Sequence, residues 1–276
     1  MKSNLATRTI SGICFVGIML AGFLVNKYLY AALVIFMIVV MLHEFYRMNI
    51  GDKLMGQRTL AIFTAICGFI IIFCINSFHI PVHFATLVFI PLSAVMISSI
   101  FEEDQDSFDL YSYIYTGLLY IAIPLVLSNY IVFDKEGVFN GQLLLCFFII
   151  IWASDIGAYC IGSMLGKNGK KLFPSISPKK SWAGYWGGLI LAMVAALVMS
   201  LTGLLKFAWY HSLILGIIMH VFGVFGDLFE SLWKRKCSVK DSGSIIPGHG
   251  GLLDRFDSSL FAIPMGAIYL ILVSLI

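Results

Sequence analysis

The stretch Leu143-Leu-Leu-Cys-Phe-Phe-Ile-Ile-Ile-Trp-Ala-Ser-Asp155-Ile-Gly-Ala-Tyr-Cys-Ile-Gly-Ser-Met-Leu165 is almost continuously apolar and carries one acidic residue near its middle. A helix that crosses a bilayer needs about 20 mostly apolar residues, within a range of about 17–25. This stretch is therefore predicted to span a membrane. An acid at the centre of such a helix costs about 2.5–3.5 kcal/mol on insertion scales, which favours a functional role for Asp155. The alternative is a carboxylate that a hydroxyl or amide group of a neighbouring helix satisfies.

The composition of the whole chain also indicates a membrane protein. Of its 276 residues, 60% are hydrophobic and 12% are charged, whereas ordinary soluble domains are about 45–50% apolar and about 25% charged. The formal net charge of +3 indicates little about partners, because in a membrane protein the side on which the charges lie matters more. We therefore expect the lipid bilayer as a partner and no nucleic acid.

Apolar runs long enough to cross a bilayer recur along the chain. We predict nine spanning helices, near residues 10–26, 28–45, 59–77, 83–100, 111–132, 143–165, 185–204, 208–226 and 259–276, and counts of eight or ten stay open. Lys and Arg gather in alternate, cytoplasmic loops when the spans are counted correctly. With the N-terminus inside, every Lys and Arg except Lys27, Lys135 and Lys206 lies on an inner segment. The predicted fold class is an all-α polytopic membrane protein with a cytoplasmic N-terminus.

No low-complexity linker divides the chain, so residues 1–276 are predicted to form a single integral membrane domain. Its N-terminal helices cover about 10–132, and the helices and loops with polar motifs cover about 143–276. Within this second part, charged residues concentrate in the long inner loops at 166–184 and 227–258. These loops are where the sequence indicates chemistry.

The second of these loops starts with acidic residues on a helix that leaves the membrane. Asp227, Glu230 and Lys234 share one helix face by their spacing. Acids one turn apart at a membrane boundary can hold a divalent cation, but a helix end that is salt-bridged to Lys234 is the commoner case. Asp254 and Asp257 are again one turn apart, on the helix that follows the loop.

A glycine-rich turn precedes that following helix. Pro247-Gly-His-Gly-Gly251 leads into an apparent helix start at Leu252, an arrangement in which backbone N–H groups and a helix N-terminus can face a phosphate. The turn is not a Walker A loop, because no G-K-[ST] follows it. A tight re-entry into the membrane is the structural alternative.

Asp227 and Asp254 flank this loop and are expected to converge at its base. Carboxylate oxygens suit magnesium, which proteins usually hold with one or two carboxylates plus substrate phosphates and water. The surrounding bases would neutralise phosphate oxygens, and they are Lys234, Arg235, Lys240 and Arg255. Acids for a metal beside bases for phosphates indicate phosphoryl or nucleotidyl transfer.

The loop at 166–184 adds a second basic motif. It contains Pro174-Ser-Ile-Ser-Pro-Lys-Lys-Ser-Trp-Ala-Gly184, and its prolines favour an extended turn. Such a turn would present Lys179 and Lys180 at a defined place instead of on a loose tail.

The histidines outside these loops show no spacing typical of metal ligands. His79, His83, His211 and His220 are therefore interpreted as packing or interfacial residues. The pair His43-Glu44, at the end of the second predicted span, is a weaker candidate for contact with the site.

Together these motifs resemble the signature of phosphatidate cytidylyltransferases, also called CDP-diacylglycerol synthases. The matching positions are Asp155, Ala158-Tyr159, Ile176-Ser-Pro-Lys-Lys180, Gly226-Asp227, Glu230-Ser231, Lys234-Arg235, Lys240-Asp241, Pro247-Gly-His-Gly-Gly251, Asp254-Arg255 and Asp257-Ser258. Their number and spacing make the resemblance specific, and the length and multispan layout agree with it. The chain departs from the family at Ser181-Trp182-Ala183-Gly184, where Thr, an aromatic or similar residue, Glu and Gly are common, so position 183 has no carboxylate.

The resemblance implies a polytopic enzyme that joins phosphatidate to CTP and yields CDP-diacylglycerol and pyrophosphate. It further implies Mg2+ as the cofactor, a polar cavity open to the cytoplasmic side, and a homodimer. The compact length favours a bacterial cytoplasmic (inner) membrane as the location.

The residue types and the resemblance together suggest roles for individual side chains. Asp227 and Asp254 are predicted to hold the metal, with Glu230 and Asp257 secondary. The predicted catalytic set is Asp155, Lys179, Lys180, Asp227, Glu230, Lys234, Arg235, Lys240, Asp241, His249, Asp254, Arg255 and Asp257. Phosphate or nucleotide binding is predicted for Ser177, Lys179, Lys180, Gly248, His249, Gly250 and Gly251.

Other functions fit part of the pattern. A CTP-dependent lipid-alcohol kinase of the dolichol or phytol type would share the membrane organisation, but the glycine-rich turn and the Ser-Pro-Lys-Lys run favour the cytidylyltransferase. An ion or solute transporter would use Asp155 as a coupling site inside the membrane. A transporter would leave both basic loops unexplained.

Overall fold

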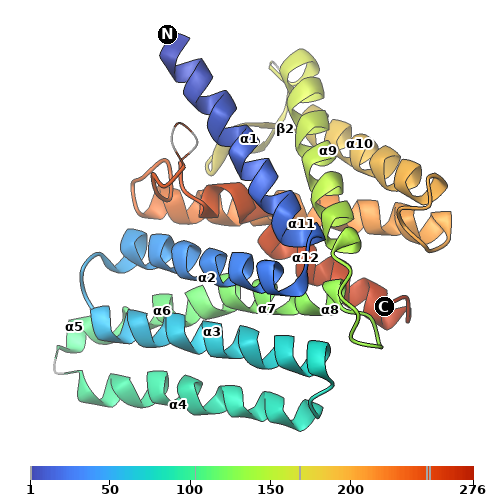
Figure 1. The fold of residues 1–276 in the computed structure, drawn as a ribbon. Coiled ribbons are helices and arrows are strands. Elements are labelled where there is room, and N and C mark those ends of the chain that lie inside the picture. The colour runs from blue at the N-terminus through green and yellow to red at the C-terminus, as the bar shows by residue number, and fades with distance from the viewer. Residues whose placement is uncertain (1, 103, 168, 247, 249) are drawn as a thin grey trace. The chain divides into compact units, whose positions relative to one another are not determined.

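The computed structural model describes residues 2–102, 104–167, 169–246, 248 and 250–276. The chain divides into two compact units, one of residues 1–140 and 241–255 and the other of residues 141–240 and 256–276. Figure 1 shows the helices of both units, numbered along the chain. The predicted single membrane domain stays a prediction.

The first unit is built mainly from long neighbouring helices. These are α1 (Lys2–Leu24), α2 (Lys27–Ile50) and α3 (Met55–Phe78), followed by η1 (Val82–Val88), α4 (Phe89–Ser98), η2 (Ser99–Phe101) and α5 (Gln105–Phe108). The side chain of Asn26 begins α2 by accepting the N–H groups of Tyr28 at 3.0 Å and Leu29 at 2.9 Å, a cap typical of Asn. In Figure 1, α2, α3 and α4 lie side by side.

The segment predicted as a span over 111–132 is helical but irregular. It consists of α6 (Tyr111–Gly117), a π-helical turn η3 (Leu118–Ala122), α7 (Ile123–Leu127) and α8 (Asn129–Val132). The hydroxyl of Tyr46 in α2 donates to the carbonyl oxygen of Ile114 at 3.0 Å. A Cβ added at Gly117 would lie 2.5 Å from the Tyr46 ring. The π-helical turn therefore starts directly after the point where α6 makes room for this ring.

The second unit combines long helices with a short hairpin. α9 (Gln142–Leu165) leads through β1 (Lys171–Phe173) and β2 (Ser177–Ser181) into α10 (Trp182–Leu201), and α11 (Trp209–Lys236) and α12 (Leu253–Leu272) follow. β1 and β2 pair in antiparallel fashion, with Lys171 opposite Ser181 and Phe173 opposite Ser177. The extended turn predicted from the prolines is thus part of a hairpin. Residues 256–272 of α12 belong to this unit.

α9 and α10 pack with their backbones nearly in contact. A Cβ at Gly157 would lie 2.6 Å from the carbonyl oxygen of Gly187, and one at Gly184 would lie 2.9 Å from that of Ala158. Small residues let membrane helices approach this closely. Ser181 begins α10 by accepting the N–H of Gly184 at 3.2 Å. The end of the hairpin is therefore held at a defined position against α9.

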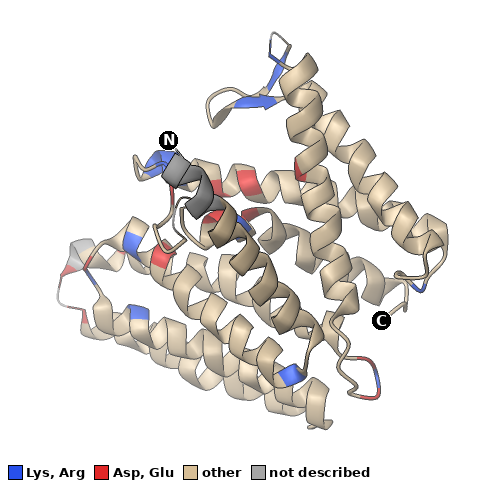
Figure 2. Ribbon diagram, turned by 45° about the horizontal axis from the view of Figure 1, so that its top comes forward, with Lys and Arg blue, Asp and Glu red and all other residues tan. Residues whose placement is uncertain are grey.

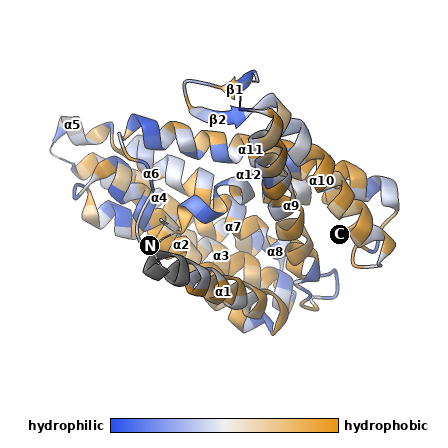
Figure 3. Cartoon of the chain, turned by 90° about the horizontal axis from the view of Figure 1, so that it is seen from above, coloured by the Kyte–Doolittle hydropathy of each residue, from blue (hydrophilic) through white to orange (hydrophobic). Residues whose placement is uncertain are grey.

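The fold class predicted from the apolar runs is confirmed. Among the described residues, eight helical stretches are long and apolar enough to cross a membrane, and they are Lys27–Ile50, Met55–Phe78, Val82–Phe101, Tyr111–Val132, Gln142–Leu165, Trp182–Leu201, Trp209–Lys236 and Leu253–Leu272. The shorter apolar helix Thr9–Leu24 corresponds to the first of the nine predicted spans. Figure 3 shows hydrophobic residues along most of these helices and hydrophilic residues on β2. The cytoplasmic location of the N-terminus stays a prediction.

The helices around the polar loop are longer than the predicted spans. α11 continues past the end of its predicted span at 226 to Lys236, as expected for the helix that carries Asp227. α12 begins at Leu253, before its predicted span at 259 and next to the helix start expected at Leu252. The apolar window ends where the charges begin, but the α11 helix continues, and Glu230 pairs with Lys234 one turn later at 2.5 Å. Asp227, Glu230 and Lys234 therefore lie on one rigid helix, as their spacing predicted.

Candidate active site

A cavity of about 630 Å³ lies in the second unit. α9 contributes Asp155 to its wall, β2 contributes Lys179 and Lys180, and α11 contributes Asp227. Each of these side chains was predicted as a site residue, and the structure brings them together around one space. Asp155 is exposed to that space, so its charge can be solvated although it lies on an apolar helix.

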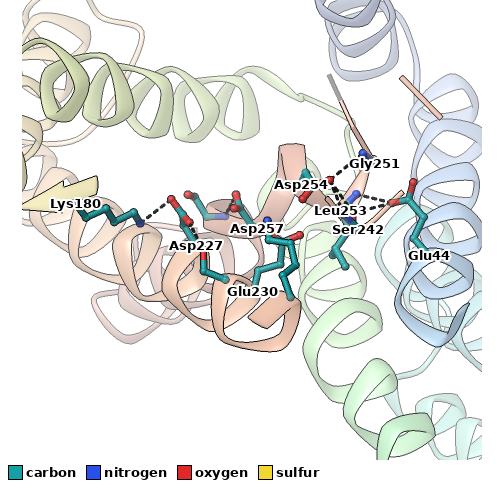
Figure 4. Close-up of polar contacts among 12 residues, drawn as sticks. Glu44, Lys180, Asp227, Glu230, Ser242, Gly251, Leu253, Asp254 and Asp257 are labelled. Carbon is teal, nitrogen blue, oxygen red and sulfur yellow. Dashed lines mark hydrogen bonds and ion pairs between the residues drawn. The ribbon is translucent and has the colours of Figure 1, made fainter. Parts of the chain in front are cut away.

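An ion pair joins the hairpin to α11 at the cavity wall. The Nζ atom of Lys180 lies 2.6 Å from Oδ2 of Asp227 (Figure 4). The hydroxyl of Ser231 donates to Oδ1 of the same carboxylate at 3.2 Å. The Lys180 and Asp227 side chains retain 25% and 32% of their exposure. Both charges are therefore oriented by the protein and still reach the cavity.

The hairpin of β1 and β2 holds Lys179 and Lys180 at a fixed position in the second unit. Lys171 of β1 donates its ammonium group to the carbonyl oxygens of Gly166 at 2.9 Å and Lys167 at 3.0 Å, close to the end of α9. A Lys at a helix C-terminus stabilises carbonyls that lack intrahelical partners. Figure 2 shows the resulting basic residues on the strands of the hairpin. Lys179 and Lys180 are thus carried by paired backbone at a fixed position.

Acidic residues gather where α11 meets α12 within the second unit. A Cβ at Gly226 would overlap the carbonyl oxygen of Asp257, so the glycine allows the two backbones to touch. Asp257 interacts electrostatically with Asp227, Glu230 and Lys234. Glu230 is fully buried, at 0% exposure, and its ion pair with Lys234 supplies the countercharge that a buried carboxylate needs. The salt-bridged alternative considered for this helix therefore applies to Glu230 and Lys234.

The carboxylates near the cavity meet only part of the requirements of a magnesium ion. Within the part of the chain that the structure describes, no group of three or more His, Cys, Asp or Glu side chains is arranged to hold a metal. Magnesium commonly uses one or two protein carboxylates, and substrate phosphates and water complete its shell. Asp227, with its carboxylate at the cavity wall, fits that smaller requirement. The predicted partner Asp254 belongs to the first unit, so the shared metal site stays a prediction.

Asp254 organises the polar loop of the first unit. Its Oδ2 atom accepts hydrogen bonds from the N–H of Ser242 at 2.9 Å, from the Ser242 hydroxyl at 3.0 Å and from the N–H of Gly251 at 2.9 Å. These bonds tie the start of the loop to its end (Figure 4). The carboxylate therefore has a structural task in addition to the predicted metal role.

Glu44 supports the same loop from α2. Its side chain is buried at 7% exposure, and its two carboxylate oxygens accept the N–H of Leu252 at 3.1 Å and the N–H of Leu253 at 2.9 Å. A Cβ at Gly243 would overlap this carboxylate, and one at Gly251 would lie 2.7 Å from it. An acid at a helix N-terminus satisfies free N–H groups and the helix dipole. Glu44 thus satisfies the backbone N–H groups of Leu252 and Leu253 at the start of α12.

The glycine-rich turn is explained largely by this local geometry. Gly248 and Gly250 have φ angles of 77° and 87°, a left-handed conformation that favours glycine. The N–H of Gly251 is used by Asp254. Phosphate binding by Gly248, Gly250 and Gly251 stays a prediction, and the predicted residue His249 lies outside the described residues.

The other predicted residues lie around these two centres. Ser177 is half-buried on β2, whereas Arg235, Lys240, Asp241 and Arg255 are exposed. Their predicted catalytic and binding roles stay predictions. Asp241 and Arg255 belong to the first unit, and Arg235 and Lys240 belong to the second.

Several residues at the cavity were not predicted from the sequence. They are Ser154, Lys167, Lys171, Tyr185 and Ser258, which line it. Ser154 also bonds to Nδ1 of the buried His220 at 2.7 Å, in agreement with the packing role expected for that histidine. Lys167 and Lys171 lie in the inner basic loop at 166–184, and that position was the signal in the sequence that could have identified them.

Comparisons with known proteins relate this chain to cytidylyltransferases. The sequence profile of the cytidylyltransferase family matches residues 6–273. A phosphatidate cytidylyltransferase of Bacillus subtilis is 48% identical over 116 residues, which is 42% of each chain. One of Staphylococcus saprophyticus is 48% identical over 124 residues, 45% of this chain and 47% of the relative, and one of Staphylococcus aureus is 46% identical over 129 residues with the same shares. The chain thus spans less than half the length of these curated relatives.

Proposed function

Since the chain belongs to the cytidylyltransferase family, we propose that it transfers CMP from CTP to phosphatidate and yields CDP-diacylglycerol and pyrophosphate. The proposal includes a Mg2+ requirement, a homodimer, and a reaction at the cytoplasmic face of a bacterial inner membrane. The observation that carries it is the cavity of the second unit, where lysines and acids from α9, the hairpin and α11 meet. The names of the bacterial relatives support the same activity.

The combination of apolar helices and a polar cavity suits a lipid substrate with a charged headgroup. Acyl chains of phosphatidate can remain among the apolar surfaces, while its phosphate enters the cavity that Lys179, Lys180 and Asp227 line. CTP reaches the same cavity from water. A site of this kind removes the need to extract the lipid from the membrane.

The attacking group of the proposed reaction is the phosphate of phosphatidate. Its second pKa is about 6, so it is largely dianionic at pH 7 and needs no strong general base. An oxygen of this phosphate forms a bond to the α-phosphorus of CTP, and the bond from that phosphorus to the bridging oxygen of the β-phosphate breaks. Pyrophosphate leaves with the electron pair. Asp155 and Asp227 are therefore not required to remove a proton.

The main barrier is the approach of two highly negative molecules. Positioned cations lower such a barrier by stabilising charge in the transition state, and removal of one stabilising group commonly costs about 10²–10³ in rate. Lys167, Lys179 and Lys180 line the cavity and would bind the phosphate oxygens. Lys171 contributes mainly by holding the end of α9, because its ammonium group donates to two carbonyls there.

The proposed Mg2+ requirement is supported by the preference of this ion for carboxylate oxygens. Asp227 and Asp254 would hold the ion, which when bound supplies positive charge to the phosphate oxygens. Lys180 and Ser231 contact the two oxygens of Asp227, so this carboxylate is oriented before substrates bind. Asp254 is oriented in the same way by Ser242 and Gly251.

The decisive experiment is incubation of the purified protein with labelled CTP, Mg2+ and phosphatidate. A lipid product that contains CMP, released together with pyrophosphate, is expected. A lipid alcohol that gains a single phosphate would instead identify a kinase. Solute counterflow in vesicles without any nucleotide would identify a transporter, and either result would refute the proposed activity.

A further inference from the structure

An apolar groove lies on the second unit beside the hairpin. Its volume is about 350 Å³, and the side chains that line it come from the hairpin, α11 and α12. They are Phe173, Ile176, Phe222, Phe225, Leu228, Phe229, Leu232 and Phe261. Phe173 and Phe225 are 41% and 50% exposed, so the groove is open along one side.

α11 carries the groove and the polar cavity on different faces of the same turns. Phe222, Phe225 and Phe229 are spaced three and four residues apart and form one stripe of the helix. Asp227 lies between them in sequence and points into the cavity. A ligand that contacts both the groove face and the cavity face of α11 must therefore have an apolar part and a charged part.

The hairpin is divided in the same way. Lys171, Lys179 and Lys180 line the cavity, whereas Phe173 and Ile176, at the turn between the strands, line the groove. The turn therefore places apolar side chains over α11 although the strands that carry it are basic. The hairpin therefore contributes side chains to both the groove and the cavity.

We propose that the groove binds an acyl chain of the lipid phosphate whose headgroup enters the cavity. This inference rests on the proposed function, because it assigns the lipid substrate of that reaction to a surface. The groove has a volume of about 350 Å³, whereas a helix of another protein is about 10–12 Å across with its side chains, so an alkyl chain is the occupant that suits its size. A single alkyl chain is thin and flexible enough to lie between the hairpin turn and α11.

The groove would act on substrate choice more than on overall affinity. Lipid tails are as apolar as the groove, so a chain that moves from the bilayer into it gains no hydrophobic energy. It gains close contacts with the aromatic side chains, and these depend on the length and shape of the chain. The groove therefore sets a preference among acyl chains and aligns the headgroup with Lys180 and Asp227.

The test fills the groove and compares substrates of different chain length. Phe225→Trp and Leu232→Trp add volume at exposed positions of the groove, whereas Ile190→Trp adds it at an exposed apolar position of α10, 62% exposed, outside the groove. The measurement is kcat/KM for dioleoyl and dihexanoyl phosphatidate in mixed micelles with CTP and Mg2+. Groove variants are expected to lose about tenfold with the long-chain lipid and little with the short one. Ile190→Trp is expected to behave as wild type with both.

A second measurement locates the chain directly. A phosphatidate with a diazirine at the end of one acyl chain should label residues 222–232 of the wild type on illumination, and Phe225→Trp should reduce that label. An active wild type whose chain-length preference is the same in all three variants would overturn the inference. Label that links two copies of the chain, together with loss of the dimer in Phe225→Trp, would assign the groove to a second copy. An inactive wild type would refute the proposed function itself, while labelling of 222–232 would still report on the groove.

Discussion

The Lys180 ammonium group lies 2.6 Å from the Asp227 carboxylate, so a loop strand and a membrane helix are joined by one ion pair at the wall of the cavity. Both side chains remain about a quarter to a third exposed, at 25% and 32%. A pair of this kind adds little stability, because solvent screens it. The ion pair instead fixes the positions of the Lys180 ammonium group and the Asp227 carboxylate at the cavity wall before substrates bind.

Replacement of Asp227 by Asn is expected to abolish most of the transfer reaction. The neutral amide keeps the size of the side chain but removes the charge proposed to hold Mg2+, and we expect a loss of about 10²–10³ in kcat. The measurement is CMP transfer to phosphatidate over a range of Mg2+ concentrations. The exposed Asp109→Asn is the matched control. Near-normal activity of Asp227→Asn at all Mg2+ concentrations would remove this residue from the metal role.

The hairpin lysines are expected to act on substrate binding. Lys179→Ala with Lys180→Ala should raise KM for CTP or phosphatidate by at least about tenfold, since charge-assisted bonds to phosphate are among the stronger hydrogen bonds. Lys180→Arg keeps the charge and should retain more activity than Lys180→Ala. Steady-state kinetics with each substrate varied in turn tests this. Unchanged kinetics in the double variant would reduce both lysines to topological signals.

Loss of the Glu44 carboxylate is expected to loosen the polar loop. Glu44→Ala leaves the N–H groups of Leu252 and Leu253 without their acceptors, which costs about 1–3 kcal/mol for each buried group. Hydrogen exchange at residues 242–254 should accelerate, and the thermal midpoint in detergent should fall. Glu44→Gln keeps an acceptor oxygen and should lie between Glu44→Ala and wild type. Glu136→Gln, at an exposed position of the same unit, serves as control, and slow exchange in Glu44→Ala would contradict the cap.

Gly226 is expected to tolerate no side chain. Its Cβ would overlap the carbonyl oxygen of Asp257, so Gly226→Ala must push α11 away from α12, at a cost of about 1–3 kcal/mol. Gly17 is also helical but has nothing within 4 Å of an added Cβ. Gly17→Ala should therefore leave stability unchanged or raise it slightly. Thermal unfolding of both variants in one detergent compares them, and equal midpoints would argue against the close contact.

Removal of the divalent ion is expected to stop the reaction reversibly. EDTA should abolish CMP transfer by the wild type, and added Mg2+ should restore it, whereas Ca2+ should restore less because it prefers more ligands and longer bonds. Product formation with a fixed excess of CTP is the readout. Full activity in EDTA would refute the magnesium requirement while leaving the assigned lysines intact.

Hydrophobic patterning predicted the membrane fold because the apolar residues of a spanning helix are contiguous in the sequence. The same approach ended the predicted span at residue 226, whereas the spacing of Asp227, Glu230 and Lys234 indicated a helix that continues beyond it, and α11 does continue to Lys236. Hydrophobic patterning also missed the strands of the hairpin. Residues 171–173 are too few to show an alternating pattern, and their strand exists because Lys171 and Phe173 find partners in β2.

The candidate site was predictable where chemistry and local spacing coincide. Asp227 and Lys180 were recognisable as charged residues in a largely apolar sequence, and both line the cavity. Glu44 was a weak candidate because its partners, Leu252 and Leu253, are more than two hundred positions away and contribute backbone groups, which any residue type carries. A hydrogen bond from a side chain to a distant backbone N–H group cannot be recognised in a single sequence.

Glu44 also fixes an order of events during synthesis of the protein. A ribosome completes α2 long before it reaches the amides of Leu252 and Leu253 that the Glu44 carboxylate accepts. Until then, the Glu44 carboxylate of the nascent chain lacks the two N–H donors that it binds in the folded protein. The polar loop of the first unit therefore closes only after residues 252 and 253 have been synthesised, and a chain that stops before residue 252 cannot form this cap.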